Sequence, residues 1–135
     1  MYLVDTNIWL ERLLAQEQAE QVGRFLEKVP PRELLITDFT LHSVGIVLTR
    51  LRHGEAFIRF VQDVLVDGAV GLASLGPEDM QKLLGVMQEY ALDLDDAYQY
   101  VAAGTKGAVI VSLDGDLDRT PQGRKTPQLV LALAP

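Results

Sequence analysis

Short apolar runs alternate with helical patterns along the chain. Four runs, at residues 1–4, 34–36, 70–73 and 109–111, have the length and composition of buried strands. Apolar positions recur at helical spacing between them, over residues 7–15, 18–29, 41–51, about 55–66, 80–87 and 94–104. A fifth apolar run, at residues 129–133, is expected to form a final edge strand. This alternation predicts an α/β fold with a parallel sheet.

Residues that favour or interrupt helices mark several boundaries. Pro30 and Pro31 end the second predicted helix, and Thr37 or Asp38 can cap the third. Gly76 and Pro77 open the helix that follows the third strand, with proline at its first position. No repeat, low-complexity tract or flexible linker interrupts the 135 residues, so we expect a single domain spanning residues 1–135.

Composition removes several classes of function. The chain has no cysteine, which excludes disulfide frameworks, thiolate zinc sites and cysteine nucleophiles. No run is long enough to span a membrane and the N-terminus lacks a basic leader, so we expect a cytoplasmic protein. The net charge of -7 argues against indiscriminate DNA binding, although acids that bind cations remain compatible with a nuclease.

Aspartates follow two of the predicted strands directly. Asp5 comes after the first run, and Asp114 lies in the turn after residues 109–111. In open parallel sheets ligands bind beyond the carboxyl ends of the strands, so these turns are expected to face one crevice. Taken singly, Asp5 and either Asp95 or Asp96 are better explained as helix caps, and Asp114 and Asp116 as turn residues. Only their joint arrangement favours a binding site.

Three segments, LVDTNIWL, LDLDDAYQYVAA and IVSLDGDLDR, resemble the acidic motifs of the PIN-domain family in order and spacing. The resemblance covers essentially the whole chain. It implies a PIN-like fold with three α/β/α layers and a short parallel sheet of four to five strands. It also implies a metal-dependent ribonuclease of the kind found among the VapC-type toxins of toxin-antitoxin pairs.

The resemblance assigns roles to particular residues. Asp5, Asp96 and Asp114 match the catalytic acids, and Asp116 joins them as a metal ligand. Asn7 stands where a polar residue orients the first aspartate, and Asp95 is a neighbouring candidate for the role of Asp96. The chain departs from the family at Ser43, which stands where a glutamate is usual. A neutral hydroxyl is a poor ligand for a hard cation, so one metal position is weakened, filled by water, or served by Asp38 or His42.

Carboxylates suit Mg²⁺ or Mn²⁺, which take oxygen ligands and activate water for phosphodiester hydrolysis. The expected substrate is RNA. In the resembling family a small antitoxin protein neutralises the toxin, and dimers are common, so an antitoxin and a homo-oligomer are the expected protein partners.

The segment RTPQGRK is the best candidate for phosphate binding, with Arg119, Arg124 and Lys125 as its cations. A solvated loop is an almost equally good interpretation. His42 and His53 lack the spacing of a zinc site and are expected at the surface or in helix packing.

Two other functions compete with the ribonuclease. A catalytically degenerate PIN domain that binds RNA or another protein is favoured by Ser43. A phosphatase of the haloacid dehalogenase type would use Asp5 as a nucleophile, but it requires a second aspartate where this chain has Asn7.

Overall fold

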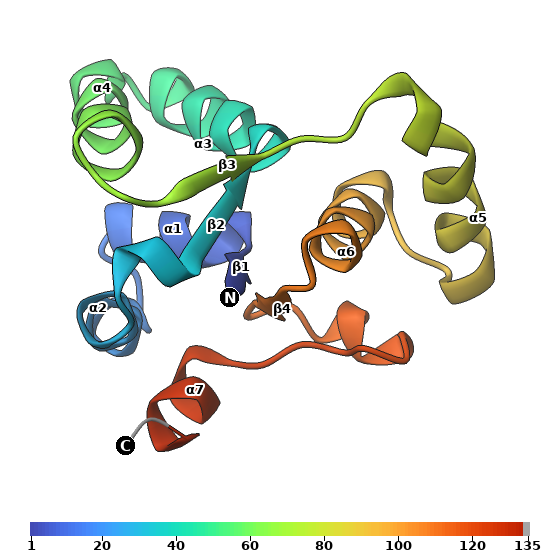
Figure 1. The fold of residues 1–135 in the computed structure, drawn as a ribbon. Helices are drawn as coiled ribbons and strands as arrows, with labels where there is room; N and C mark the ends of the chain where they lie inside the picture. The colour runs from blue at the N-terminus through green and yellow to red at the C-terminus, as the bar shows by residue number, and fades with distance from the viewer. Residues whose placement is uncertain (134–135) are drawn as a thin grey trace.

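The structure is a computed structural model that describes residues 1–133, and its centre is a four-stranded parallel sheet in the order β3-β2-β1-β4. The four central predicted strands are confirmed. Their bounds are β1 (Tyr2–Val4), β2 (Leu34–Thr37), β3 (Gly71–Ala73) and β4 (Val109–Val111). The chain is therefore an α/β protein (Figure 1).

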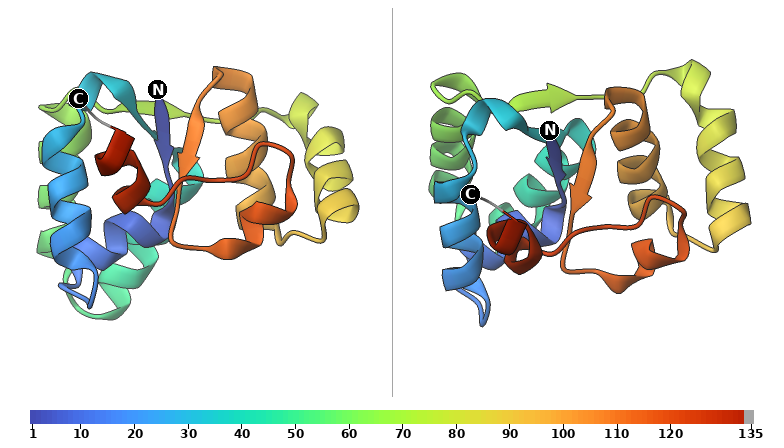
Figure 2. Two further views of the ribbon diagram at one scale, coloured as in Figure 1. Left: turned by 90° about the horizontal axis from the view of Figure 1, so that it is seen from below. Right: turned by 60° about the horizontal axis from the view of Figure 1, so that its bottom comes forward.

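Seven helices surround the sheet and form two layers. Helices α5 and α6 lie on one side, while α1, α2, α3, α4 and α7 lie on the other (Figures 1 and 2). The helices are α1 (Thr6–Leu13), α2 (Ala19–Lys28), α3 (Asp38–Arg50), α4 (Gly54–Phe60), α5 (Met80–Tyr90), α6 (Leu94–Lys106) and α7 (Pro127–Leu133). Short helical segments are η1 (Pro31–Glu33), η2 (Val61–Val66), η3 (Pro77–Asp79) and η4 (Gly115–Arg119).

Alternation along the strands explains the two layers. Successive side chains of a strand point to opposite faces of the sheet. Val4 and Val111 accordingly pack with the larger helical layer, whereas Leu3 and Ile110 pack with α5 and α6. Because both faces are covered, the strands read as continuous apolar runs.

The expected edge strand at residues 129–133 is wrong, because this segment lies in α7. Thr126 accepts a hydrogen bond from the backbone N–H of Leu129 at 3.1 Å, and Pro127 begins the helix. Pro127 and Val130, three residues apart, bury one face of the helix. Beside β4 a single bridge between Val111 and Lys125 takes the place of a fifth strand.

The predicted helix at residues 55–66 is present but changes its winding. Helix α4 ends at Phe60, and the chain continues as the π-helical segment η2. Thr37, and not Asp38, caps α3, since its hydroxyl accepts a hydrogen bond from the backbone N–H of Thr40 at 3.0 Å.

The sheet order places the ends of two distant segments side by side. β1 pairs in parallel with β4, Val4 lying opposite Val111. The backbone N–H of Asp5 then donates to the carbonyl oxygen of Val111 at 3.0 Å. The turns after β1 and β4 therefore meet at one edge of the sheet, beside the start of α6. Within the described chain, no helix is both long and apolar enough to cross a membrane.

Candidate metal centre

Asp5 lies at the bottom of the site, where β1 passes into α1. Its side chain is buried, and its Oδ1 accepts hydrogen bonds from Gln99 Nε2 at 2.9 Å and from the backbone N–H of Thr6 at 2.8 Å. Its Oδ2 accepts one from the hydroxyl of Ser112 at 2.8 Å. Asp5 therefore caps α1 and also belongs to a buried polar network, while its role as a metal ligand stays a prediction.

Ser112 connects Asp5 to the turn after β4. Its hydroxyl oxygen accepts hydrogen bonds from the backbone N–H of Asp114 at 2.9 Å and from Asn7 Nδ2 at 3.1 Å. The Oδ1 of Asn7 in turn accepts from the backbone N–H of Leu113 at 3.1 Å. Asn7 thus orients the turn after β4, and its contact with Asp5 is a longer one of 3.5 Å.

Asp96, Asp114 and Asp116 form a second group of carboxylates, the outer cluster, in which Asp114 and Asp116 are less buried than Asp5. Each offers one carboxylate oxygen, and these oxygens all lie within 4.8 Å of one another. Asp96 is contributed by the first turn of α6, whereas Asp114 caps η4 by accepting from the backbone N–H of Asp116 at 2.9 Å. Three of the four predicted acids thus lie close enough together to share one ion, and Asp5 lies close enough to Asp96 to raise its pKa.

The cluster carries a concentrated negative charge. The pKa of Asp96 is raised to about 7, first by burial and then by the neighbouring carboxylates of Asp114, Asp95 and Asp5, in that order. Burial also raises the pKa of Asp5, against the lowering effect of the hydrogen bonds from Gln99, Ser112 and Thr6. A cation between the carboxylates would offset both effects.

The basic residues predicted to bind phosphate follow the turn after β4, and two of them form ion pairs within the chain. Arg119 donates to Asp116 Oδ1 at 3.2 Å and to the carbonyl oxygen of Ala91 at 2.7 Å. Arg124 pairs with Asp118 and donates to the carbonyl oxygen of Ser112 at 3.0 Å. Lys125 joins the edge of β4 through its backbone. The role of all three in RNA binding stays a prediction.

Other residues weighed from the sequence lie outside the cluster. Asp38 accepts a hydrogen bond from the hydroxyl of Tyr98 at 2.7 Å, and Tyr98 itself is buried in the core. His42 and His53 are exposed. Ser43 lies one turn beyond Thr40 on α3, so these two side chains share a helix face. Thr40 faces Gln99, which places Ser43 on the side of α3 nearest the polar network.

Two residues of the network were not singled out from the sequence, Gln99 and Ser112. Both had a signal. Ser112 directly follows β4, in the same position after its strand that Asp5 has after β1. Gln99 lies among buried apolar residues of α6, such as Val101 and Ala102, where a buried amide must find hydrogen-bond partners.

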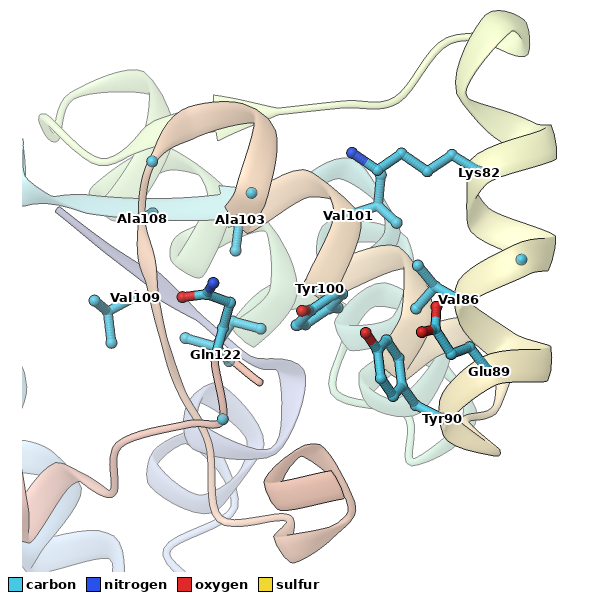
Figure 3. Close-up of a pocket in the computed structure, with 15 residues that line it drawn as sticks. Lys82, Val86, Glu89, Tyr90, Tyr100, Val101, Ala103, Ala108, Val109 and Gln122 are labelled. Atoms are coloured by element: carbon cyan, nitrogen blue, oxygen red, sulfur yellow. The ribbon is translucent and has the colours of Figure 1, made fainter. Parts of the chain in front are cut away.

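A separate hollow of about 750 Å³ lies between α5, α6 and the start of β4 (Figure 3). Tyr90 and Tyr100 meet edge to face in it, with ring centroids 5.9 Å apart, and Lys82, Glu89 and Gln122 also line it. It opens at the amino end of β4, whereas the aspartates gather at the carboxyl end, and none of them lines it.

A comparison with known protein families shows which family the chain belongs to. The sequence profile of the PIN domain matches residues 2–123, which include β1, α6, β4 and all four aspartates of the site. The chain belongs to the PIN domain family. No curated protein sequence matches the chain.

Several solved structures have the same PIN-like fold. A toxin-antitoxin complex from Klebsiella pneumoniae superposes with a TM-score of 0.75 at 20% identity, covering 94% of this chain and 98% of that one. VapC20 from Mycobacterium tuberculosis, a sarcin-ricin loop cleaving toxin, gives 0.75 at 16% identity, with 86% and 92% covered. FitAcB from Neisseria gonorrhoeae gives 0.75 at 19% identity, with 95% and 99% covered. At these identities the similarity concerns the PIN fold.

Proposed function

We propose that this PIN domain is a metal-dependent endoribonuclease that hydrolyses RNA phosphodiester bonds at the outer cluster. The observation that carries the proposal is the convergence of carboxylate oxygens of Asp96, Asp114 and Asp116 within 4.8 Å, with the buried Asp5 close enough to Asp96 to raise its pKa. Four carboxylates from β1, α6 and the turn after β4 would be costly neighbours without a cation. Their arrangement at the carboxyl edge of a parallel sheet suits a substrate that approaches from solvent.

The donor set fits a hard divalent cation. Carboxylate oxygens suit Mg²⁺ or Mn²⁺, and neither thiolates nor paired histidines are available to favour a softer metal. Asp96, Asp114 and Asp116 would hold the ion, with Asp5 as the further acidic ligand below them. When bound, such an ion lowers the pKa of water and stabilises the charge that develops on the phosphate.

The chain's own groups orient the site around that ion. Ser112 and Asn7 fix the backbone of the turn that carries Asp114, so its carboxylate is held at the strand end. Arg119, Arg124 and Lys125 follow this turn and would hold phosphates on either side of the scissile bond. Arg119 also pairs with Asp116, so it can place a phosphate next to the outer cluster.

The protein partner we propose is a small antitoxin, as in a toxin-antitoxin pair. Support comes from the fold, which is shared with a toxin-antitoxin complex and with FitAcB over almost the whole of each chain. A basic side chain of such a partner would be attracted to the outer cluster and would compete with the cation there. We also propose a homo-oligomer, a dimer being the simplest closed form.

A cleavage assay on single-stranded and structured RNA tests the proposed activity. We expect cleavage with Mn²⁺ or Mg²⁺, none with EDTA, and a loss of more than about 1000-fold in Asp114→Asn, because several kcal/mol of charge stabilisation is removed. Asp118→Asn is the matched control, since Asp118 lies in the same turn but pairs with Arg124 outside the cluster. Cleavage that survives EDTA or Asp114→Asn would disprove the proposal.

A second candidate function is a degenerate PIN domain that binds RNA or a protein without cleaving it. Ser43 favours it, because the acid that the family usually supplies from α3 is missing. In that case Mn²⁺ would bind weakly, and RNA would bind without turnover. Calorimetric titration with Mn²⁺, followed by RNA binding in the same buffer, separates this function from the nuclease.

A further inference from the structure

We infer that Gln99 is a positioning residue of the metal centre, which holds Asp5 in the orientation that a cation requires. This inference rests on the proposed function, because the role of Gln99 is to orient a proposed ligand. Gln99 does not reach the outer cluster. It would act through Asp5, because Gln99 binds one carboxylate oxygen of Asp5 while Ser112, next to the turn that carries Asp114, binds the other.

The amide of Gln99 is buried, and both its nitrogen and its oxygen are hydrogen-bonded. Its side chain is 1% exposed. The two hydrogens of Nε2 are donated to Asp5 Oδ1 at 2.9 Å and to Thr40 Oγ1 at 2.7 Å. Its Oε1 accepts a hydrogen bond from the hydroxyl of Thr37 at 2.7 Å. A buried amide with these three bonds has one defined position, since any movement would leave a polar group unpaired.

The neighbours also fix which way round the amide lies. The hydroxyl of Thr37 accepts from the backbone N–H of Thr40, so its own proton is free to be donated to Oε1 of Gln99. If the amide were reversed, its oxygen would face the carboxylate of Asp5, and two acceptors would lie in contact. The donor side of Gln99 is therefore directed at Asp5.

The bond from Gln99 determines how Asp5 is presented to the outer cluster. Oδ1 accepts hydrogen bonds from Gln99 and from the backbone N–H of Thr6. Oδ2 carries the close bond from Ser112, whose oxygen also accepts from the backbone N–H of Asp114. A hydrogen-bonded path thus runs from Gln99 through Asp5 and Ser112 to Asp114. Oδ2 is the oxygen of Asp5 that connects this path to the turn after β4.

A neutral donor suits this position better than a charged one. Lysine or arginine would bind the Asp5 carboxylate more strongly but would cancel the charge that attracts a cation. Gln99 orients the carboxylate and leaves its charge in place. Hydrogen-bond partners of metal-binding carboxylates are known to govern metal affinity in this indirect manner. Helix α6 therefore carries two linked parts of the site, Asp96 in the cluster and Gln99 one turn further along.

The test compares Mn²⁺ affinity and stability in Gln99→Met, which keeps the length of the side chain and removes its hydrogen bonds. We expect Mn²⁺ affinity, measured by calorimetry, to fall about 10- to 100-fold. RNA cleavage should lose kcat with little change in KM, because the substrate-binding groups are untouched. Gln99→Asn is the second variant. It keeps an amide that is too short to reach Asp5 and Thr40 together, and an intermediate loss is expected.

A matched control separates positioning from a general loss of stability. Val22→Ala empties part of the core on the far side of the sheet, where Val22 is fully buried on α2, and it touches no member of the network. It should lower the melting temperature while leaving Mn²⁺ affinity unchanged. The positioning role is wrong if Gln99→Met binds Mn²⁺ as tightly as the wild type. It is also wrong if Val22→Ala, at equal stability, loses as much Mn²⁺ affinity as Gln99→Met.

The proposed function can fail separately from the role of Gln99. If the wild-type protein binds no Mn²⁺, the metal-dependent nuclease is wrong and the positioning role is overturned with it. If the wild type and Asp114→Asn differ as expected while Gln99→Met behaves like the wild type, only the role of Gln99 is overturned.

Discussion

The inner and outer carboxylates of the site are neighbours with opposite surroundings. Asp5 is buried among neutral donors from Gln99, Ser112 and the backbone of Thr6. Asp96 is buried to a similar degree, yet the groups that dominate its surroundings are the carboxylates of Asp114, Asp95 and Asp5. Hydrogen bonds thus partly offset the cost of burying the inner carboxylate, whereas like charges add to the cost of burying Asp96 in the outer cluster. Burial alone does not distinguish the two carboxylates, but the charge of their neighbours does.

The largest effect on stability is expected at the inner carboxylate. Asp5→Ala leaves the donors of Gln99, Ser112 and Thr6 without their shared acceptor in a buried site. We expect a loss of about 3 kcal/mol in the free energy of unfolding and a fall of about 10 °C in the melting temperature without metal. Thermal unfolding in EDTA measures this. If Asp5→Ala has the melting temperature of the wild type, the hydrogen bonds of the inner carboxylate do not contribute to stability as expected.

The outer cluster is expected to respond in the opposite direction. The pKa of Asp96 is raised to about 7, above its value of about 3.9 in the unfolded chain, so the folded state binds the proton more tightly. Without metal, the contribution of Asp96 to the free energy of unfolding should therefore be most favourable below about pH 4 and be lost as the pH rises through about 7.

Asp96→Asn removes this titration. At pH 8 in EDTA we expect it to be more stable than the wild type by about 1 to 2 kcal/mol, a difference that should vanish near pH 4. Saturating Mn²⁺ should reverse the order, because only the wild type gains binding energy. Melting curves across pH, with and without Mn²⁺, measure both effects. An Asp96→Asn protein that is less stable at pH 8 in EDTA would show that the cluster is not repulsive.

Ser43 offers a way to add to the outer charge. Ser43→Glu should raise Mn²⁺ affinity by about 10-fold and lower stability in EDTA, since the new carboxylate needs the cation to offset repulsion. Glutamate suits the helix, and its position near the start of α3 is favourable for negative charge. Ser43→Gln has the same length without charge and serves as control. Equal Mn²⁺ binding by calorimetry in all three proteins would mean that position 43 does not face the cluster.

The smallest effect is expected from the basic side chains of Arg124 and Lys125, which are proposed to bind RNA. Lys125→Ala should reduce the salt dependence of RNA binding by about one unit of slope and leave the melting temperature unchanged. Lys28→Ala, at the far end of α2, is the control. Arg124→Ala should weaken RNA binding at low salt as well, but it should also lower stability, because Arg124 holds the carbonyl of Ser112. An unchanged slope in both variants would exclude this segment from RNA binding.

The polar network could be anticipated only in part. Asp5 and Asp114 were placed correctly because each follows a short apolar run, and parallel strands end at one edge of a sheet. The partners of Asp5 were not foreseen. Gln99 reads as one more polar residue on a helix until the packing of α6 against β1 and α3 shows that it faces inward.

The sequence by itself determined the order of strands and helices and the positions of the acids, because apolar spacing and turn residues act over a few neighbours. It misplaced residues 129–133, where an apolar run of this length fits either a strand or a buried helix, and contact with α2 decided for the helix. Only the tertiary structure separated the inner carboxylate from the outer cluster. That division depends on which distant donors reach each oxygen, and such contacts are created by the fold and not by spacing along the chain.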